Sequence, residues 1–214
     1  MRPSGTLAKL ELSTDYRLEK LRKVAGVLAV PMSREVDLRV SYVTINVLNT
    51  WSNFVRAFYL SCLTSCKSVS GSRVSTGLQI KDFDDGIYQA VRLIRPKAPL
   101  PISGVVKRRD EPAWHDPDTL LRLAAAFAFS NKVTIDAAIS LQPATFKELT
   151  VFRNYFAHRN DTTSAVAMRI GTKYGIVGQR TPCGVLVCKP VGRPQALLME
   201  WIDDIIATVQ LMCL

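Results

Sequence analysis

The sequence predicts an all-α fold, a bundle of about six helices. Apolar residues recur every three or four positions through most of the chain, which is the spacing of one face of an α-helix. Few segments alternate apolar and polar residues as a half-buried strand does. One small irregular or β-hairpin insertion is expected near residues 171–194, which contain Gly, Pro and the apolar run Val185-Leu186-Val187.

The start of the chain predicts two helices. The first covers 15–29 with Asp15 as its cap, and Pro31 ends it because proline lacks the amide hydrogen that the helix needs. The second begins at Ser33 and runs to about Cys66, because helical spacing outweighs the strand propensity of its β-branched start. The expected buried stripe of this long helix comprises Val40, Val43, Val47, Trp51, Phe54, Val55, Phe58 and Cys62.

A loop, a short helix and a proline-rich segment follow. Residues 65–77 are rich in Ser, Gly and Thr and predict a flexible loop. A short helix over 84–95 ends at Pro96. The segment 96–117 is basic and rich in proline, so we expect an extended segment that is either an insertion or a loop that contacts substrate.

The rest of the chain returns to helical spacing. The expected elements are a helix from Asp116 or Asp118 to Ser130, a helix over 134–141, a helix from Pro143 to His158 that resumes to Ile170 after a pause at 159–162, and a final helix from Pro194 to about Met212.

Length and composition predict a single domain over 1–214 with a helical extension over 1–32. An odd number of cysteines, five, fits a reducing cytoplasm. No stretch approaches the length of apolar sequence that spans a membrane, and residues 1–5 lead into no signal region. Cys62 and Cys66 are one helical turn apart without two further ligands nearby, so neither a metal site nor a cofactor is expected.

The chain is basic, with a formal net charge of +10. Between Thr162 and Met199 every charged residue is basic, namely Arg169, Lys173, Arg180, Lys189 and Arg193. A second such run comprises Arg92, Arg95, Lys97, Lys107, Arg108 and Arg109. Positive stretches attract a polyanion such as RNA or DNA, and the alternatives are solubility or an acidic protein partner.

A candidate site lies within the helix that ends near His158. Imidazole transfers protons near neutral pH, and the planar guanidinium of Arg153 suits a phosphate. Asn154 and His158 share a helix face, so Asn154 is expected to hold one ring nitrogen of His158. The core stripe of this helix, on a different face, is expected to be Leu149, Phe152 and Phe156.

The pattern Arg153-Asn154-x-x-x-His158 resembles the signature of the HEPN superfamily, small helical proteins of which many are metal-independent RNA endonucleases. The specific resemblance covers about nine residues, and the order of helices agrees over about two thirds of the chain. It implies that the RNA 2′-hydroxyl attacks the adjacent phosphorus, with His158 as general base or acid. Arg153 would stabilise the charge on the phosphate and Asn154 would orient His158 or contact the phosphate.

The resemblance also implies partners. A homodimer would bring two copies of the motif helix together, with RNA between them and with Arg159, Arg169 and Lys173 as RNA-binding residues. Proteins of this kind act as toxins or antiphage effectors, so an antitoxin or regulatory protein is a further expected partner. Some of these toxins carry a Tyr two residues after the His, where the antitoxin attaches nucleotides. Asn160 occupies that position, so silencing by that route is not expected.

Two alternatives to a nuclease stay open. A noncatalytic HEPN-like module would bind nucleic acid or protein and use Arg153 and His158 structurally, and an unrelated helical interaction protein would have this spacing by accident. Arg109 lies six residues before His115 and so offers a second Arg-to-His pair, but Pro112 and Pro117 prevent one regular helical face there. His115 would become the second proton-transfer group if the active species were a monomer. Arg56 is expected to make a structural ion pair or to lie at the surface.

Overall fold

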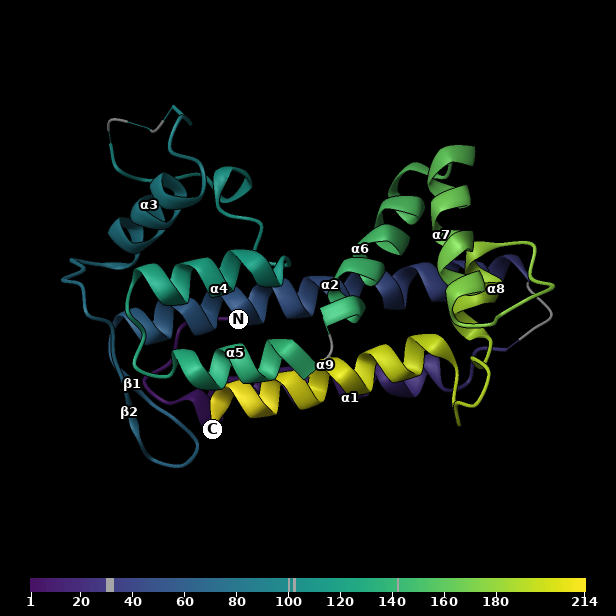
Figure 1. The fold of residues 1–214 in the computed structure, drawn as a ribbon, viewed down its shortest axis with the longest axis horizontal. Coiled ribbons are helices and arrows are strands. Elements are labelled where there is room, and N and C mark those ends of the chain that lie inside the picture. The colour runs from purple at the N-terminus through teal and green to yellow at the C-terminus, as the bar shows by residue number, and fades with distance from the viewer. Residues whose placement is uncertain (30–32, 100, 102, 142) are drawn as a thin grey trace. The chain divides into compact units, whose positions relative to one another are not determined.

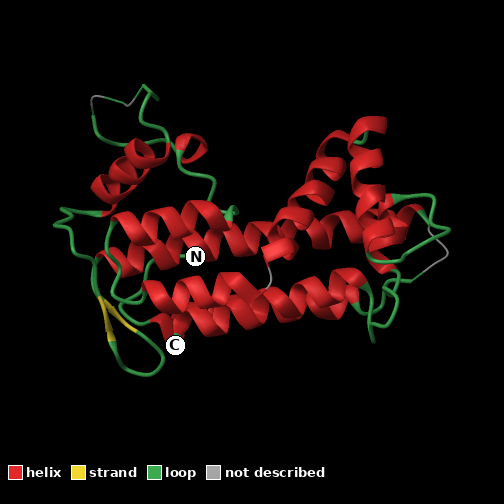
Figure 2. Ribbon diagram, in the orientation of Figure 1, coloured by secondary structure: helices red, strands yellow, loops and turns green. Residues whose placement is uncertain are grey.

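The computed structural model describes residues 1–29, 33–99, 101, 103–141 and 143–214. Helices dominate these residues (Figures 1 and 2), which confirms the all-α prediction. The helices are α1 (Leu7–Ala25), α2 (Arg34–Leu63), α3 (Phe83–Ile94), α4 (Pro117–Ala126), α5 (Lys132–Leu141), α6 (Pro143–His158), α7 (Asp161–Lys173), α8 (Pro182–Val187) and α9 (Leu197–Cys213). The remaining regular elements are a 3-10 turn at Arg108–Asp110 and the strands β1 (Cys66–Lys67) and β2 (Arg73–Val74).

The chain divides into two compact units. Unit 1 comprises Met1–Thr14, Trp51–Leu141 and Thr208–Leu214, and unit 2 comprises Asp15–Thr50 and Gln142–Ala207. Helices α1, α2 and α9 therefore contribute residues to both units. The described part of the predicted extension over 1–32 is likewise shared between them.

Unit 1 has an aromatic core. The buried ring of Tyr59 lies 5.2 Å from that of Trp114 and meets Phe127 edge-on at 5.6 Å. The Tyr59 hydroxyl donates to the carbonyl of Gly86 at 2.9 Å, so the first half of α3 is fixed to α2. Rings in these orientations add to the stability that burial alone supplies.

The segment 65–77, predicted to be a flexible loop, contains the two strands. They pair antiparallel, with Cys66 opposite Val74 and Lys67 opposite Arg73. The amide of Lys67 also donates to the carbonyl of Gly5 at 3.0 Å. The contact with Gly5 comes from a position distant in sequence, which the local content of Ser and Gly does not reveal.

Unit 2 is built around the start of α2, α6, α7 and part of α9. Figure 1 shows α6 and α7 as neighbouring antiparallel helices, as expected from the short turn between them. The ring of Phe152 on α6 meets that of Trp201 on α9 edge-on at 5.5 Å. Arg22 on α1 forms an ion pair with Asp203 on α9 at 2.5 Å.

Two elements differ from the prediction. Helix α1 begins at Leu7 rather than at Asp15, because the apolar stripe already starts at Leu7 and Leu10, both buried. Its predicted terminator, Pro31, lies outside the described residues. The segment 171–194 contains α8, while the hairpin of this structure lies between Cys66 and Val74.

Helix α8 forms for local reasons. Thr181 Oγ1 accepts from the amide of Gly184 at 3.1 Å, and Pro182 occupies the first turn. The apolar run at its end, which suggested a strand, packs Val185 and Leu186 into the core. None of the described helices is long and apolar enough to cross a membrane.

Candidate functional site

Helix α6 presents the sequence-predicted motif. Leu149, Phe152 and Phe156 are buried as expected, with at most 8% of each residue exposed. Burial of this stripe fixes which face of α6 points outward. Arg153, Asn154 and His158 are all exposed on that outer surface, and His158 is the last residue of the helix.

The structure does not form the expected hydrogen bond between Asn154 and His158. Asn154 Oδ1 instead accepts from Arg153 Nη1 at 3.4 Å. His158 accordingly has no hydrogen-bond partner among the described residues, so its imidazole is open to a ligand.

Arg153 and His158 project in different directions from one α6. They are five residues apart, which places them about 140° apart around the helix axis. A single motif helix therefore offers an imidazole and a guanidinium at one end without directing both at one point. The two groups can meet at one phosphate only if the long Arg153 side chain bends toward His158 or if a second copy of α6 contributes one of them.

Arg159, which was predicted to bind RNA, is hydrogen-bonded to α2 within unit 2. It adopts a left-handed backbone conformation with φ of 45° and separates α6 from α7. Its Nη1 donates to Asp37 Oδ2 at 2.7 Å, and its Nη2 donates to Ser41 Oγ at 2.8 Å. The hydrogen bond to Asp37 raises the pKa of Arg159. The Cys183 thiol donates to the other Asp37 oxygen at 2.6 Å, and burial raises the pKa of that thiol.

Lys173, a second predicted RNA contact, is also paired. Its Nζ lies 2.5 Å from Glu148 Oε1, and the Tyr174 hydroxyl donates to Glu148 Oε2 at 2.7 Å. Burial, followed by the hydrogen bond with Glu148, raises the pKa of Tyr174 to about 12. Lys173 thus compensates a largely buried carboxylate and contributes less free positive charge to the surface than its sequence position suggests.

Arg169, the third predicted RNA contact, keeps an open guanidinium. It lies on the exposed face of α7, and no acceptor for it is found in the described part of the chain. Asn160 Oδ1 caps this helix by accepting from the amide of Thr163 at 2.9 Å. The exposed face of α7 therefore offers one unpaired cation on a helix that packs against the motif helix.

The structure adds a charged cluster in unit 1 that the sequence did not single out. Glu111, in the proline-rich segment, has a side chain only 3% exposed and pairs with Arg56 and Arg108. The expectation of a structural ion pair for Arg56 is confirmed. One feature of the sequence could have pointed to this cluster, an acidic residue within a basic, proline-rich stretch. Acidic side chains are rarely buried unless they are paired, so a buried Glu111 is expected to pair with its basic neighbours.

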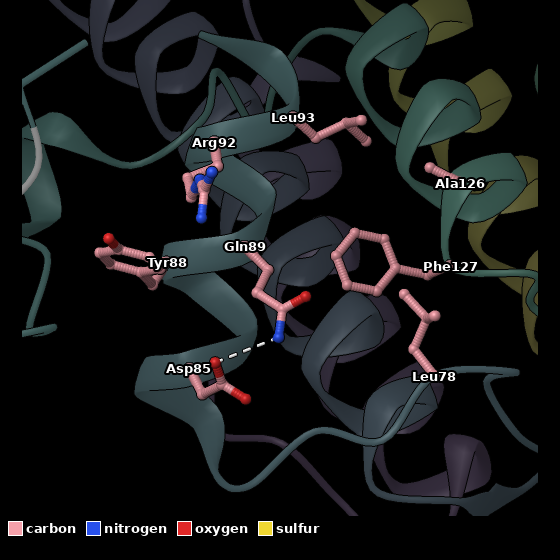
Figure 3. A pocket seen from close by; sticks show the side chains of 8 residues that line it. All are labelled: Leu78, Asp85, Tyr88, Gln89, Arg92, Leu93, Ala126 and Phe127. Atoms are coloured by element: carbon pink, nitrogen blue, oxygen red, sulfur yellow. Dashed lines mark hydrogen bonds between the residues drawn. The ribbon is translucent and has the colours of Figure 1, made fainter. Parts of the chain in front are cut away.

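Unit 1 also has a cavity of about 600 Å³ beside α3 (Figure 3). Asp85, Gln89 and Arg92 of α3 line one side, and Phe127 lies opposite them. Gln89 Nε2 donates to Asp85 Oδ1 at 3.1 Å, as the dashed line shows. The cavity is lined by one acidic residue, one basic residue and a mixture of polar and apolar side chains, so its chemistry favours no particular class of ligand.

Comparison of the chain with protein-family models, with curated proteins and with solved structures finds no match in any of the three. The function therefore has to be argued from the arrangement of the side chains.

Proposed function

We propose that this protein is a HEPN-like, metal-independent RNA endonuclease that acts as a toxin or antiphage effector in the cytoplasm. The observation that carries the proposal is the exposure of Arg153, Asn154 and His158 at the end of α6, on a helix whose opposite stripe is buried. A nuclease site on a rigid helix needs this separation of chemistry from packing.

The reaction would be a transesterification within the RNA. His158 would remove the proton of the 2′-hydroxyl, whose oxygen then forms a bond to the adjacent phosphorus. The bond from phosphorus to the 5′-oxygen breaks, and that oxygen takes a proton from an acid. The products are a 2′,3′-cyclic phosphate and a 5′-hydroxyl. Arg153 would stabilise the negative charge on the nonbridging oxygens.

The reaction needs an acid as well as a base, and each α6 supplies one histidine. A homodimer that brings two α6 ends together about a two-fold axis would provide both groups. It would also compensate for the divergence of Arg153 and His158 on a single helix. Arg169 would draw the RNA backbone toward this site as an unpaired cation, with Arg159 and Lys173 supporting the fold around it.

The test is cleavage of RNA by purified protein in excess chelator. Wild type should cleave, while His158→Ala and Arg153→Ala should each lose at least about 100-fold in rate. Arg122→Ala, which removes an exposed arginine of α4, is the matched control and should retain full activity. Equal cleavage by all four proteins would sink the proposed site, since all the activity would then come from elsewhere.

Oligomeric state supplies a second arm of the test. Light scattering should show a dimer at the concentration of the assay. An active monomer would remove the two-fold site and make His115 the second proton-transfer group.

A noncatalytic module that binds nucleic acid or a protein is the second candidate. It is favoured by the ion pairs of Arg159 and Lys173 and by the absence of an Asn154 to His158 bond within the described structure. This candidate predicts RNA binding by the wild type without cleavage. His158→Ala would then leave the affinity for RNA unchanged.

A further inference from the structure

A second cavity of unit 1 is lined by three residues of the basic run that the motif site does not use, Arg95, Arg108 and Arg109. It measures about 390 Å³, within the range of small-ligand sites, roughly 300–1,000 Å³. Its charged and titratable lining comprises Arg95, Arg108, Arg109, Glu111 and His115. The prolines that prevent a helical face between Arg109 and His115 thus fold the segment so that both residues border one cavity.

Glu111 is the fixed centre of this site. Its Oε2 accepts from Arg56 Nε at 2.6 Å, Trp114 Nε1 at 2.7 Å and Arg108 Nη1 at 3.0 Å. Its Oε1 accepts from Arg56 Nη2 at 2.9 Å. A carboxylate has about four acceptor positions, so Glu111 has no capacity left for the remaining cations.

Positive charge exceeds negative charge around the cavity. Four guanidinium groups gather there, those of Arg56, Arg95, Arg108 and Arg109. The carboxylates in contact with them are Glu111 and Asp110, and Arg109 Nε lies 3.6 Å from Asp110 Oδ2. Two positive charges therefore remain without a counter-charge among these groups.

Two of these arginines, Arg95 and Arg108, are held in place but keep unused donors. Arg95 Nη2 donates to the carbonyls of Asp110 and Glu111, which are backbone groups without net charge. Arg108 Nη2 donates to Asn53 Oδ1 at 2.9 Å, and its Nε has no acceptor among the described residues. Ion pairs and carbonyl bonds thus orient the guanidinium planes in advance, which lowers the entropy lost when an anion binds.

Burial lowers the pKa of Arg108, and the nearby Arg56 lowers it further against the opposing effect of Glu111. A second anion beside Arg108 would relieve this crowding of like charges. The orientation of the guanidinium groups and the excess of positive charge therefore both favour an anionic ligand.

We propose that this cavity binds the phosphate group of a phosphate monoester through Arg95, Arg108 and Arg109. A monoester carries close to two negative charges above its second pKa of about 6, which matches the excess of the site. Guanidinium groups bind phosphate with paired, planar hydrogen bonds. The proposal concerns unit 1 and does not depend on the cleavage reaction proposed for α6.

Two ligands carry such a group, a free mononucleotide and the 5′-phosphorylated end of an RNA. Calorimetric titration of the full chain at pH 8 with AMP, adenosine, and 5′-phosphorylated and 5′-hydroxyl 2′-O-methyl oligonucleotides separates them. The 2′-O-methyl group blocks the attack proposed for α6, so cleavage does not disturb the titration. AMP should bind at least about tenfold more tightly than adenosine, because charged hydrogen bonds are lost with the phosphate.

A higher affinity of the 5′-phosphorylated oligonucleotide than of both AMP and its 5′-hydroxyl counterpart would identify the RNA end as the ligand. Equal affinities of the two oligonucleotides, with AMP still preferred over adenosine, would identify the mononucleotide. Arg109→Gln, in a side chain 80% exposed, should weaken AMP binding about tenfold without lowering the melting temperature. Arg122→Gln removes the same charge away from the cavity and should leave the affinity unchanged. Equal binding of AMP and adenosine, or equal losses in the two variants, would overturn the proposal.

Discussion

The guanidinium of Arg159 lies 2.7 Å from the carboxylate of Asp37, which joins the residue after the motif helix to the first turn of α2. Arg159 directly follows His158, so this ion pair fixes the end of α6 at the point where the proposed chemistry occurs. The same carboxylate accepts a hydrogen bond from the thiol of Cys183 in α8. Asp37 therefore ties together three segments of unit 2, and the cation that the charge pattern assigned to RNA has a structural partner.

Arg159→Ala should lower the free energy of unfolding by about 1–2 kcal/mol. Two hydrogen bonds disappear, one of them to a carboxylate, and the partial exposure of the pair reduces their worth. Urea denaturation measures the change. Arg39→Ala, which breaks the exposed pair with Glu35, is the control and should cost no more than about 0.5 kcal/mol.

The backbone conformation of Arg159 allows a second comparison, between Arg159→Gly and Arg159→Ala. Its φ of 45° is a conformation that glycine adopts without strain. Arg159→Gly should therefore be about 1 kcal/mol more stable than Arg159→Ala, although both lack the ion pair. Equal stability of the two variants would mean that the left-handed conformation does not persist in solution.

Glu111→Ala should destabilise the protein by about 3–5 kcal/mol, because it leaves the cations around a buried carboxylate without their partner. Glu111→Gln retains an acceptor and the shape of the side chain, so its loss should be smaller. Thermal and urea unfolding give both values. Asp110→Ala, at an exposed neighbouring acid, should cost less than about 0.5 kcal/mol, and a comparable loss there would contradict the central position of Glu111.

The sequence predicts the helices with long apolar stripes well. Helix α2 starts directly after Ser33, whose Oγ accepts from the amide of Val36 at 3.2 Å, and the predicted stripe from Val40 to Cys62 is buried. The pause after His158 is also present, between α6 and α7. These features depend on periodicity and capping, which act over a few residues.

Features that depend on distant partners were not predicted. Asp37 and Glu148 decide which basic side chains stay free. They lie 122 and 25 residues away from their partners, Arg159 and Lys173. Helix α8 was missed since Val-Leu-Val suggests a strand, while the deciding groups are the Thr181 cap and Pro182. Charge counts identified a basic chain correctly but did not separate paired cations from open ones.

Gly86→Ala should destabilise unit 1 by about 1–3 kcal/mol, although alanine is the better helix former. A Cβ at Gly86 would overlap Cδ1 of the buried Leu63, and Gly86 is also held by the Tyr59 hydroxyl. Leu63→Ala removes the overlapping atom and creates a cavity by itself. The double variant should therefore lose less than the sum of the two single losses in urea denaturation. Strict additivity would show that the two side chains do not compete for this space.

Asp204→Asn should change how stability depends on pH. Burial raises the pKa of Asp204 above its ordinary value, outweighing the hydrogen bond that Thr145 Oγ1 donates to it at 2.7 Å. Between the unfolded pKa, about 3.9, and the raised folded value, the folded state holds a proton that the unfolded state has lost. The free energy of unfolding of the wild type therefore falls as pH rises through this window. Above the window the loss caused by the ionised Asp204 stays constant.

Asparagine carries no charge and still accepts a hydrogen bond from Thr145. The variant should therefore not lose stability as pH rises through this window. Its free energy of unfolding relative to wild type should increase as pH rises above the unfolded pKa and level off above the raised folded pKa. Urea denaturation across this range gives the difference, and titration of the Asp204 carboxyl carbon by NMR gives the pKa directly. Parallel stability curves for the two proteins would show that burial does not penalise the Asp204 carboxylate in solution.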